Sequence, residues 1–226
     1  MKKWLKITLI ILLVLVIAVA ALVIWQWKNI QSIYMGLTQS EEEIVRQRKD
    51  NQVKLVEDVD GYLDGEIRDL TEEEKQKIED GTLKIEDIYA GIFEEKHQQI
   101  VDENEKGQPH SSKDEIISRY MAQLYALQSE YTAKADVLIA EGKAYYKNQL
   151  KSKSKSSAQS DTINAFKPRV RALESECDSK VGETVSSLEK ELKAIGAETD
   201  IVRTIKASYE NEKQLKLAYY ANKYLK

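Results

Sequence analysis

The sequence contains few of the residues that build cross-linked, metal-binding or turn-rich folds. Its 226 residues include one cysteine, two histidines and two prolines. One cysteine excludes an internal disulfide framework and a cysteine-rich metal cluster, and two histidines exclude most zinc sites. Two prolines and nine glycines are too few for a β-sandwich or a barrel built on tight turns. The composition therefore predicts neither a metal nor another cofactor.

Sequence motifs of catalysis are absent as well. The chain has no G-x-S-x-G, no P-loop, no G-x-G-x-x-G and no paired metal motif. An acidic turn at residues 58–65 approaches the spacing of a calcium loop if Asp60 is its first position. Tyr62 and Thr71 then stand where two oxygen ligands are needed, one of them bidentate. We predict no catalytic residue, no metal ligand and no enzymatic activity.

One long apolar run lies near the N-terminus. Residues 7–25 carry no charge, and Thr8 has their single hydroxyl group. These 19 residues would span roughly 28 Å as a helix, which matches the hydrocarbon core of a bilayer. Lys2, Lys3 and Lys6 precede the run, so the positive-inside rule orients the N-terminus toward the cytoplasm. The sequence predicts a transmembrane signal-anchor in the lipid bilayer, and hence a single-pass plasma-membrane protein with an extracytoplasmic C-terminal domain.

Two alternatives stay open for this segment. Ala18, Val19 and Ala20 have the small-x-small form of a signal-peptidase site, although apolar residues continue past it to Trp25. The second alternative keeps the large domain in the cytosol, anchored by its N-terminus. In each case we expect the function to lie in residues 28–226.

Charge divides the remainder of the chain into two parts. Residues 28–110 hold 22 acidic and 11 basic residues, whereas residues 111–226 hold 16 acidic and 20 basic residues. A polar segment at residues 105–112 lies between them and marks the expected boundary. We predict a cytoplasmic stub and signal-anchor at residues 1–27, an acidic helical stalk at 28–110 and a bundle domain at 111–226.

The acidic part has two interpretations. Its charges can form solvated helix faces, or they can bind cations, a basic partner or the basic distal half of the chain. Nucleic acid is excluded as a partner by the net negative charge outside the apolar run and by the lack of arginine clusters.

Apolar spacing and capping residues predict helices throughout residues 28–226. On the first long helix, apolar side chains recur with heptad spacing from Ile117 to Tyr145, interrupted by Gln128 and Gly142. The sequence predicts an all-α fold: a transmembrane helix, short acidic helices and a C-terminal antiparallel three-helix bundle. Short helices are expected after Ser40, after Thr71 and over residues 83–99, and long ones over residues 113–151, 161–195 and 200–225, with a mobile run at 151–160.

Tyrosines gather in the C-terminal part, where nine of the twelve lie. Tyr131 and Tyr145 fall on the heptad seam and are expected in the core. Exposed tyrosines provide large contact areas at low entropic cost, which suits a binding face. Ordinary amphipathic boundary positions are the alternative. The predicted partner-binding face consists of Tyr125, Tyr146, Tyr220 and Tyr224.

A resemblance in architecture accompanies these patterns. The stretches LTEEEK at residues 70–75 and ALESEC at residues 172–177 belong to a long helical remainder that follows the apolar run. The arrangement resembles bacterial single-pass membrane proteins with helical outer domains, and the resemblance implies no activity. We predict a tether or scaffold with a protein partner or with self-association through the bundle. The alternative is a sensor or accessory subunit of a membrane complex.

Overall fold

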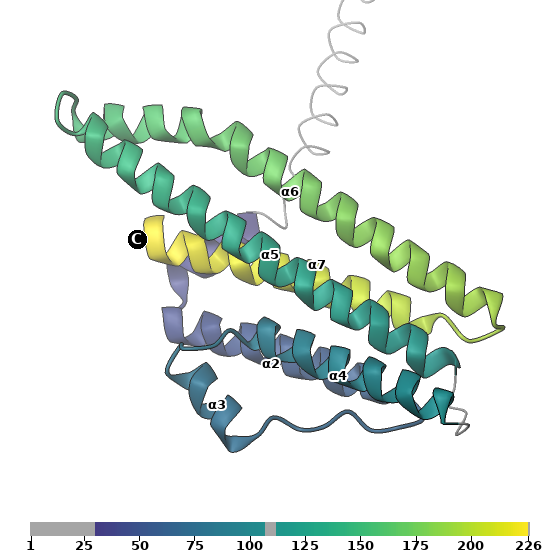
Figure 1. Cartoon of the computed structure of the whole chain (residues 1–226). Helices are drawn as coiled ribbons and strands as arrows, with labels where there is room; N and C mark the ends of the chain where they lie inside the picture. The colour runs from purple at the N-terminus through teal and green to yellow at the C-terminus, as the bar shows by residue number, and fades with distance from the viewer. Residues whose placement is uncertain (1–29, 107–111, 226) are drawn as a thin grey trace, which may run out of the picture. The chain divides into compact units, whose positions relative to one another are not determined.

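A computed structural model describes residues 30–106 and 112–225, with side chains up to Lys223. Within these ranges all regular structure is helical, so the predicted all-α class is confirmed. A helical stretch over residues 30–38 comes first. Six further helices follow (Figure 1): α2 (Glu41–Asp60), α3 (Glu72–Glu79), α4 (Ile85–Glu105), α5 (Ser112–Gln149), α6 (Lys155–Ala194) and α7 (Asp200–Leu225).

A capping box defines the start of α3. The Thr71 hydroxyl accepts a hydrogen bond from the Glu74 N–H at 3.2 Å, and the Glu74 carboxylate accepts one from the Thr71 N–H at 2.8 Å. Arg68 also donates to this carboxylate and is the main reason that the pKa of Glu74 falls to about 2. The capping residues predicted from the sequence therefore act as expected.

The N-cap of helix α6 lies seven residues earlier than the sequence predicts. Its N-cap is Ser154, whose hydroxyl accepts a hydrogen bond from the Ser157 N–H at 3.3 Å. The predicted cap, Asp161, lies inside the helix and accepts a hydrogen bond from Lys153 at 2.6 Å. Much of the run at residues 151–160, expected to be mobile, is thus helical because a serine is available earlier to satisfy the first free N–H groups.

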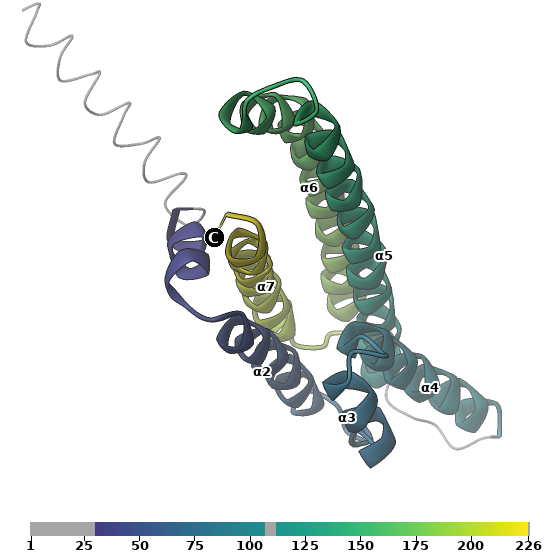
Figure 2. The same cartoon turned by 90° about the vertical axis from the view of Figure 1, so that its left-hand side faces the viewer.

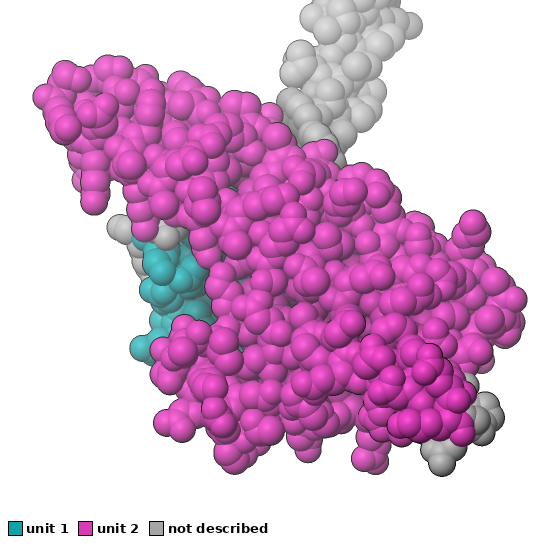
Figure 3. Space-filling model, in the orientation of Figure 1, with its two compact units in different colours: residues 1–55, 207–226 teal, residues 56–206 magenta. Residues whose placement is uncertain are grey.

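The described chain divides into two compact units (Figure 3). Unit 1 combines residues 30–55 with residues 207–225, and unit 2 consists of residues 56–206, apart from 107–111. Helices α2 and α7 therefore contribute to both units. Unit 1 is assembled from two segments that are far apart in the sequence.

These units differ from the predicted domains. Residues 28–110 and residues 111–226 do not form two separate compact units. Helix α4 packs along α5, and residues 207–225 of α7 pair with α2. The predicted boundary falls on residues 107–111, which lie outside the described residues, as do residues 1–27. The three helices α5, α6 and α7 consequently do not make up one compact unit.

In unit 1, α2 and α7 run antiparallel and share a polar interface. The Arg48 guanidinium donates to the Glu212 carboxylate at 2.9 Å and lies 5.9 Å from the centre of the Tyr219 ring. One turn further along α2, the Asn51 amide donates to the backbone carbonyl of Ser208 at 3.3 Å. Glu212 is almost fully buried, so this charged pair sets the register of the two helices.

The stretch 30–38 packs its small residues against α7. Gly36 is buried, and a Cβ added to it would lie 2.3 Å from the carbonyl oxygen of Ala218. The buried Asn222 amide donates to the backbone carbonyls of Gly36 and Gln39, each at 2.8 Å. The larger apolar side chains of the stretch are exposed: Ile30, Ile33, Tyr34 and Leu37.

In unit 2, α5 packs against both α4 and α6. The Tyr125 ring, 1% exposed, contacts Tyr89 and Phe93 of α4, with ring centroids 5.4 and 5.7 Å away. Figure 2 shows α5 and α6 side by side along most of their length. Their buried apolar side chains lie toward the start of α5 and the end of α6: Ile117, Met121, Val181, Val185, Leu188 and Leu192.

A buried carboxylate organises the acidic turn that follows α2. Asp114 accepts hydrogen bonds from the Asp64 N–H at 3.0 Å and the Gly65 N–H at 3.3 Å. Within the turn, Asp60 accepts one from the Ile67 N–H at 2.7 Å. Backbone donors thus occupy the carboxylates of Asp60 and Asp114. The described ranges contain no group of three or more side chains that could hold a metal ion.

The predicted localisation requires correction. Among residues 30–106 and 112–225, no helix combines the length and the apolar character that a membrane span needs. This finding contradicts the prediction of a single-pass plasma-membrane protein with an extracytoplasmic domain. Charged side chains recur along each of the helices α2 to α7, which is the physical reason. The apolar run at residues 7–25 lies outside the described residues.

Candidate functional site

The candidate site lies on the outer part of the hairpin formed by α5 and α6. Successive contacts pair later residues of α5 with earlier residues of α6, from Tyr120 with Glu191 to Tyr145 with Phe166, so the helices are antiparallel. We call residues 133–180 the hairpin arm. They comprise the end of α5, the five-residue connection and the first part of α6.

A tyrosine–glutamate hydrogen bond joins the two helices at the base of the arm. The Tyr131 hydroxyl donates to the Glu176 carboxylate at 2.8 Å, and Lys134 donates to the same oxygen at 3.0 Å. Burial and then the Glu176 hydrogen bond raise the pKa of Tyr131 to about 12. The hydrogen bonds from Tyr131 and Lys134 lower the pKa of Glu176. Glu176 is therefore a charged acceptor at neutral pH.

A second contact of this kind lies further from the arm. The Tyr120 hydroxyl donates to Glu191 at 2.6 Å, and Arg119 forms an ion pair with the same carboxylate. Burial and the hydrogen bond to Glu191 raise the pKa of Tyr120. The Tyr120 hydrogen bond is the main reason that the pKa of Glu191 is lowered. Together the two contacts fix the register of α5 against α6.

Burial decreases sharply within the arm. Of its 48 residues, Ala158 is the one that is buried. Val137 is 60% exposed, Ile163 52% and Val170 51%, and Tyr145 and Leu150 are also exposed. Each square ångström of apolar surface left in water forgoes about 25 cal/mol of stabilisation. Contiguous apolar patches, rather than single exposed residues, mark interaction sites, and the arm is a candidate for such a surface.

The interruption of the heptad seam at Gly142 is filled from α6. Ring carbons of Phe166 lie 3.6 to 3.8 Å from where a Cβ of Gly142 would stand. The same ring lies 5.8 Å from the Tyr145 ring and 4.9 Å from the Arg169 guanidinium. The seam at Gly142 is therefore occupied from within the hairpin by the Phe166 ring.

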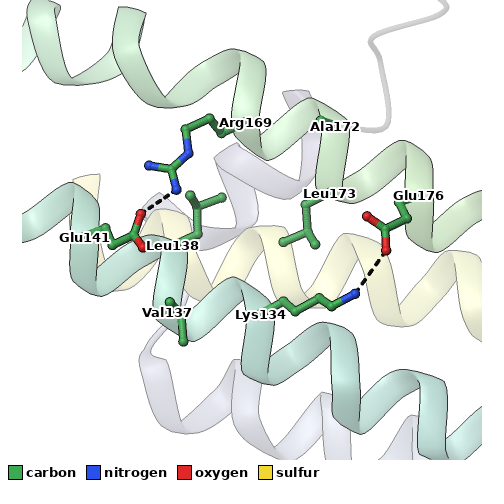
Figure 4. Close-up of a pocket in the computed structure, with 8 residues that line it drawn as sticks. All are labelled: Lys134, Val137, Leu138, Glu141, Arg169, Ala172, Leu173 and Glu176. Atoms are coloured by element: carbon green, nitrogen blue, oxygen red, sulfur yellow. Dashed lines mark hydrogen bonds and ion pairs between the residues drawn. The ribbon is translucent and has the colours of Figure 1, made fainter.

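A shallow groove with a volume of about 340 Å³ lies between the two helices of the arm (Figure 4). At one end Arg169 pairs with Glu141 at 2.5 Å, and at the other Lys134 pairs with Glu176 at 3.0 Å. Aliphatic side chains lie between the two ion pairs. The lining residues are Lys134, Val137, Leu138, Glu141, Arg169, Ala172, Leu173 and Glu176.

The lining of the groove is suited to binding an apolar side chain. Its four charged groups form ion pairs with one another, and its remaining lining is aliphatic. Pockets for small molecules are usually concave and bury most of the ligand surface, which a shallow groove does not do. A helix from another protein can place an apolar side chain in such a groove and align its own charges with the ion pairs.

The four predicted binding tyrosines do not form one surface. Tyr125 lies in the core of unit 2, because it packs on two aromatic rings of α4. Tyr146 is half-buried and belongs to the arm, whereas Tyr220 is half-buried in unit 1. The side chain of Tyr224 lies outside the described residues. Of the four, Tyr146 is the residue that falls within the candidate site.

Sequence patterns missed the exposed aliphatic residues of the arm. Val170 lies within the long helix expected to end near residue 195 and is half exposed. Val137 directly precedes Leu138 and therefore points about 100° away from the heptad seam. The sequence signal for an exposed apolar residue was therefore the position of Val137 directly beside the seam. This signal becomes interpretable only when the exposure of the side chain is known.

The chain matches no protein-family model, no curated protein and no solved structure.

Proposed function

We propose that this protein is a non-catalytic structural protein that binds another protein through its hairpin arm. The observation that carries the proposal is the 48-residue arm with one buried side chain. In proteins, most of the stability of a helix comes from packing its apolar face. A partner that covers exposed apolar side chains of the arm, such as Val137 beside the groove, would supply packing that the arm lacks.

The groove favours a helical partner. Its aliphatic floor accepts one or two apolar side chains, and the ion pairs at its two ends provide charged groups that fix the orientation of a bound helix. Arginine, here Arg169, is a residue type enriched at protein interfaces.

The arm is also well placed for a scaffold role. Helix α5 continues without a break from the aromatic core at Tyr125 into the arm. Its 38 residues extend over about 57 Å. The tyrosine–glutamate contacts anchor the inner end, so a partner bound on the arm would be held at a defined distance from the core of unit 2.

Site-specific crosslinking tests this function. A photoreactive amino acid is placed in the full chain at Val137 or at Val170, in cells that produce the protein. The control position is Leu83, an exposed apolar residue of unit 2 outside the arm. We expect discrete protein adducts from the two arm positions, and their yield should fall when Ile163→Glu is added.

Two results would contradict the proposal. One is the absence of adducts at both arm positions. The other is an equal set of adducts at Leu83, which would mean that crosslinking follows exposure alone rather than a binding surface.

A further inference from the structure

The tip of the hairpin arm carries a concentrated positive charge. Residues 142–160 contain five lysines and no acidic residue, and one of these lysines, Lys153, forms an ion pair with Asp161 at 2.6 Å. Lys147, Lys151 and Lys155 are exposed, and the exposed Leu150 lies among them. Nearby lysines repel one another, so a cluster of this kind is stabilised when an acidic surface covers it.

Helix α4 of the same unit carries the opposite charge. It has seven acidic residues and one lysine among its 21 residues. Glu94, Asp102 and Glu105 are exposed, and their spacing of eight and three residues places them on one face of the helix. The buried side chains of α4, such as Ile92 and Ile100, lie on another face.

The two charged surfaces lie at opposite ends of unit 2. Helix α4 runs antiparallel to α5, because Asp87 contacts Ser129 while Phe93 contacts Tyr125. The acidic face beyond Phe93 therefore lies beside the start of α5. About 25 helical residues separate Tyr125 from the tip, a distance of roughly 40 Å. Charges interact over about 8 Å at physiological salt, so the surfaces do not neutralise each other within one chain.

We propose that the partner of the hairpin arm is a second copy of this chain, bound antiparallel so that each basic tip lies on the acidic face of the other copy's α4. This assignment rests on the proposed function of the arm. An antiparallel pair has two-fold symmetry, so the contact between a basic tip and an acidic α4 face forms twice. The pair is closed, because no basic tip or acidic face is left to bind a third copy. The groove beside the exposed Val137 of each arm then lies between the copies.

Salt dependence is the first test. The purified full chain is examined by sedimentation velocity at about 0.05 M and about 0.5 M salt. We expect a dimer at the lower concentration and a dissociation constant at least about ten-fold higher at the upper one, since exposed charge pairs are screened. A monomer at low salt, or open polymers in place of a dimer, would overturn the proposal.

Charge reversal is the second test. One variant reverses the tip and another reverses the acidic face, and circular dichroism checks that both remain helical. Each variant alone should associate at least about ten-fold more weakly than the unaltered chain, and a mixture of the two should restore the dimer. The tip variant is Lys147→Glu, Lys151→Glu and Lys155→Glu; the α4 variant is Glu94→Lys, Asp102→Lys and Glu105→Lys.

A matched control carries Lys190→Glu, Lys193→Glu and Lys206→Glu, three exposed lysines of unit 2 outside the arm. This control should associate as strongly as the unaltered chain. Association that the tip variant leaves intact, or a mixture that stays monomeric, would overturn the proposal. If the purified chain is monomeric and Val170 crosslinks to a different protein, the assignment of the partner as a second copy is overturned. The proposed function of the arm would stand in that case. Absence of any arm crosslink would overturn the proposed function itself.

Discussion

At the scale of single residues, small and polar side chains decide how segments approach each other. Gly36 allows the stretch 30–38 to contact the backbone of α7, and Asn222 satisfies two carbonyl groups at the end of that stretch. Buried carbonyl groups without partners cost about 1–3 kcal/mol each, so these hydrogen bonds are required for the close approach. The packing of the stretch on α7 thus depends on two residues without large apolar side chains.

Gly36→Ala should destabilise unit 1. The new Cβ would lie 2.3 Å from a backbone oxygen of α7, which cannot rotate away, and overpacking of this kind costs about 1–3 kcal/mol. The free energy of unfolding, measured in urea, should fall by that amount. Gly91→Ala is the matched control, because no atom lies within 4 Å of its added Cβ and alanine favours a helix by about 0.5–1 kcal/mol. Equal effects at both positions would contradict the close contact.

Asp114→Ala should loosen the acidic turn after α2. The buried carboxylate accepts hydrogen bonds from the N–H groups of Asp64 and Gly65, and hydrogen bonds to charged groups contribute about 1.5–3 kcal/mol each. Hydrogen exchange at these two amides should accelerate. Glu115→Ala changes the same helix end without removing these contacts and is the control. Unchanged exchange in the Asp114 variant would show that other contacts hold the turn.

At the scale of helices, polar contacts set the register of α5 and α6 where their apolar contacts become sparse. Tyr120 and Tyr131 each donate to a glutamate of α6, and each glutamate also has a cationic partner. These bonds are directional, whereas half-exposed apolar side chains allow the helices to slide. The hairpin therefore keeps one register although its outer part has almost no buried core.

These contacts predict a pH dependence with a plateau near neutrality. The pKa values of Glu176 and Glu191 are lowered by folding. Their contribution is therefore present above an unfolded pKa of about 4.3 and is lost as the pH falls through the folded pKa. The pKa of Tyr131 is raised to about 12, so its contribution is present below an unfolded pKa of about 10 and is lost as the pH rises through the folded value.

The double variant Tyr120→Phe, Tyr131→Phe should flatten this profile. Without the phenol donors, the free energy of unfolding should change less than in the unaltered chain. This holds between pH values near 7 and 3 and also between pH values near 7 and 12. Urea unfolding at the three pH values measures the difference. An unchanged profile would mean that other titrating groups produce the pH dependence.

At the scale of the whole molecule, the chain closes unit 1 from its two ends. In unit 1, helix α2 pairs with residues 207–225 of α7, which follow the segment that forms unit 2 in the sequence. The pairing buries Ile44, Leu55 and Leu215, and it also covers Glu212. Contacts between segments so far apart in the sequence carry an additional entropic cost, because the long loop between them must close before they can form.

Removal of residues 207–226 should therefore unfold part of α2 and leave the α5–α6 hairpin folded. In the shortened chain, amides of residues 41–55 should lose their protection from hydrogen exchange, because Ile44 and Arg48 lose their contacts. Amides around Tyr120 should stay protected. Retained protection of residues 41–55 would show that α2 is stable without α7.

The sequence by itself determined the helical class and several helix ends. Capping residues such as Thr71 act within one turn of the chain, and apolar periodicity reflects the geometry of a single helix, so both signals are local. The heptad seam correctly marked Ile117, Met121 and Tyr131 as core, whereas its prediction of a buried Tyr145 is wrong because that side chain is 36% exposed. Local signals did not identify Ser154 as the cap of α6, because serine and aspartate are both good caps and nearby candidates compete.

Tertiary structure alone decided which helices pair and which apolar residues stay exposed. Tyr125 and Tyr146 occupy the same heptad position of one helix, each directly after a seam residue. Tyr125 is nevertheless buried against α4, whereas Tyr146 is half-buried on the arm. The pairing of α2 with α7 and the exposure of Val137 and Val170 likewise depend on segments distant in the chain. Burial is a property of what lies next to a side chain, and no local pattern carries that information.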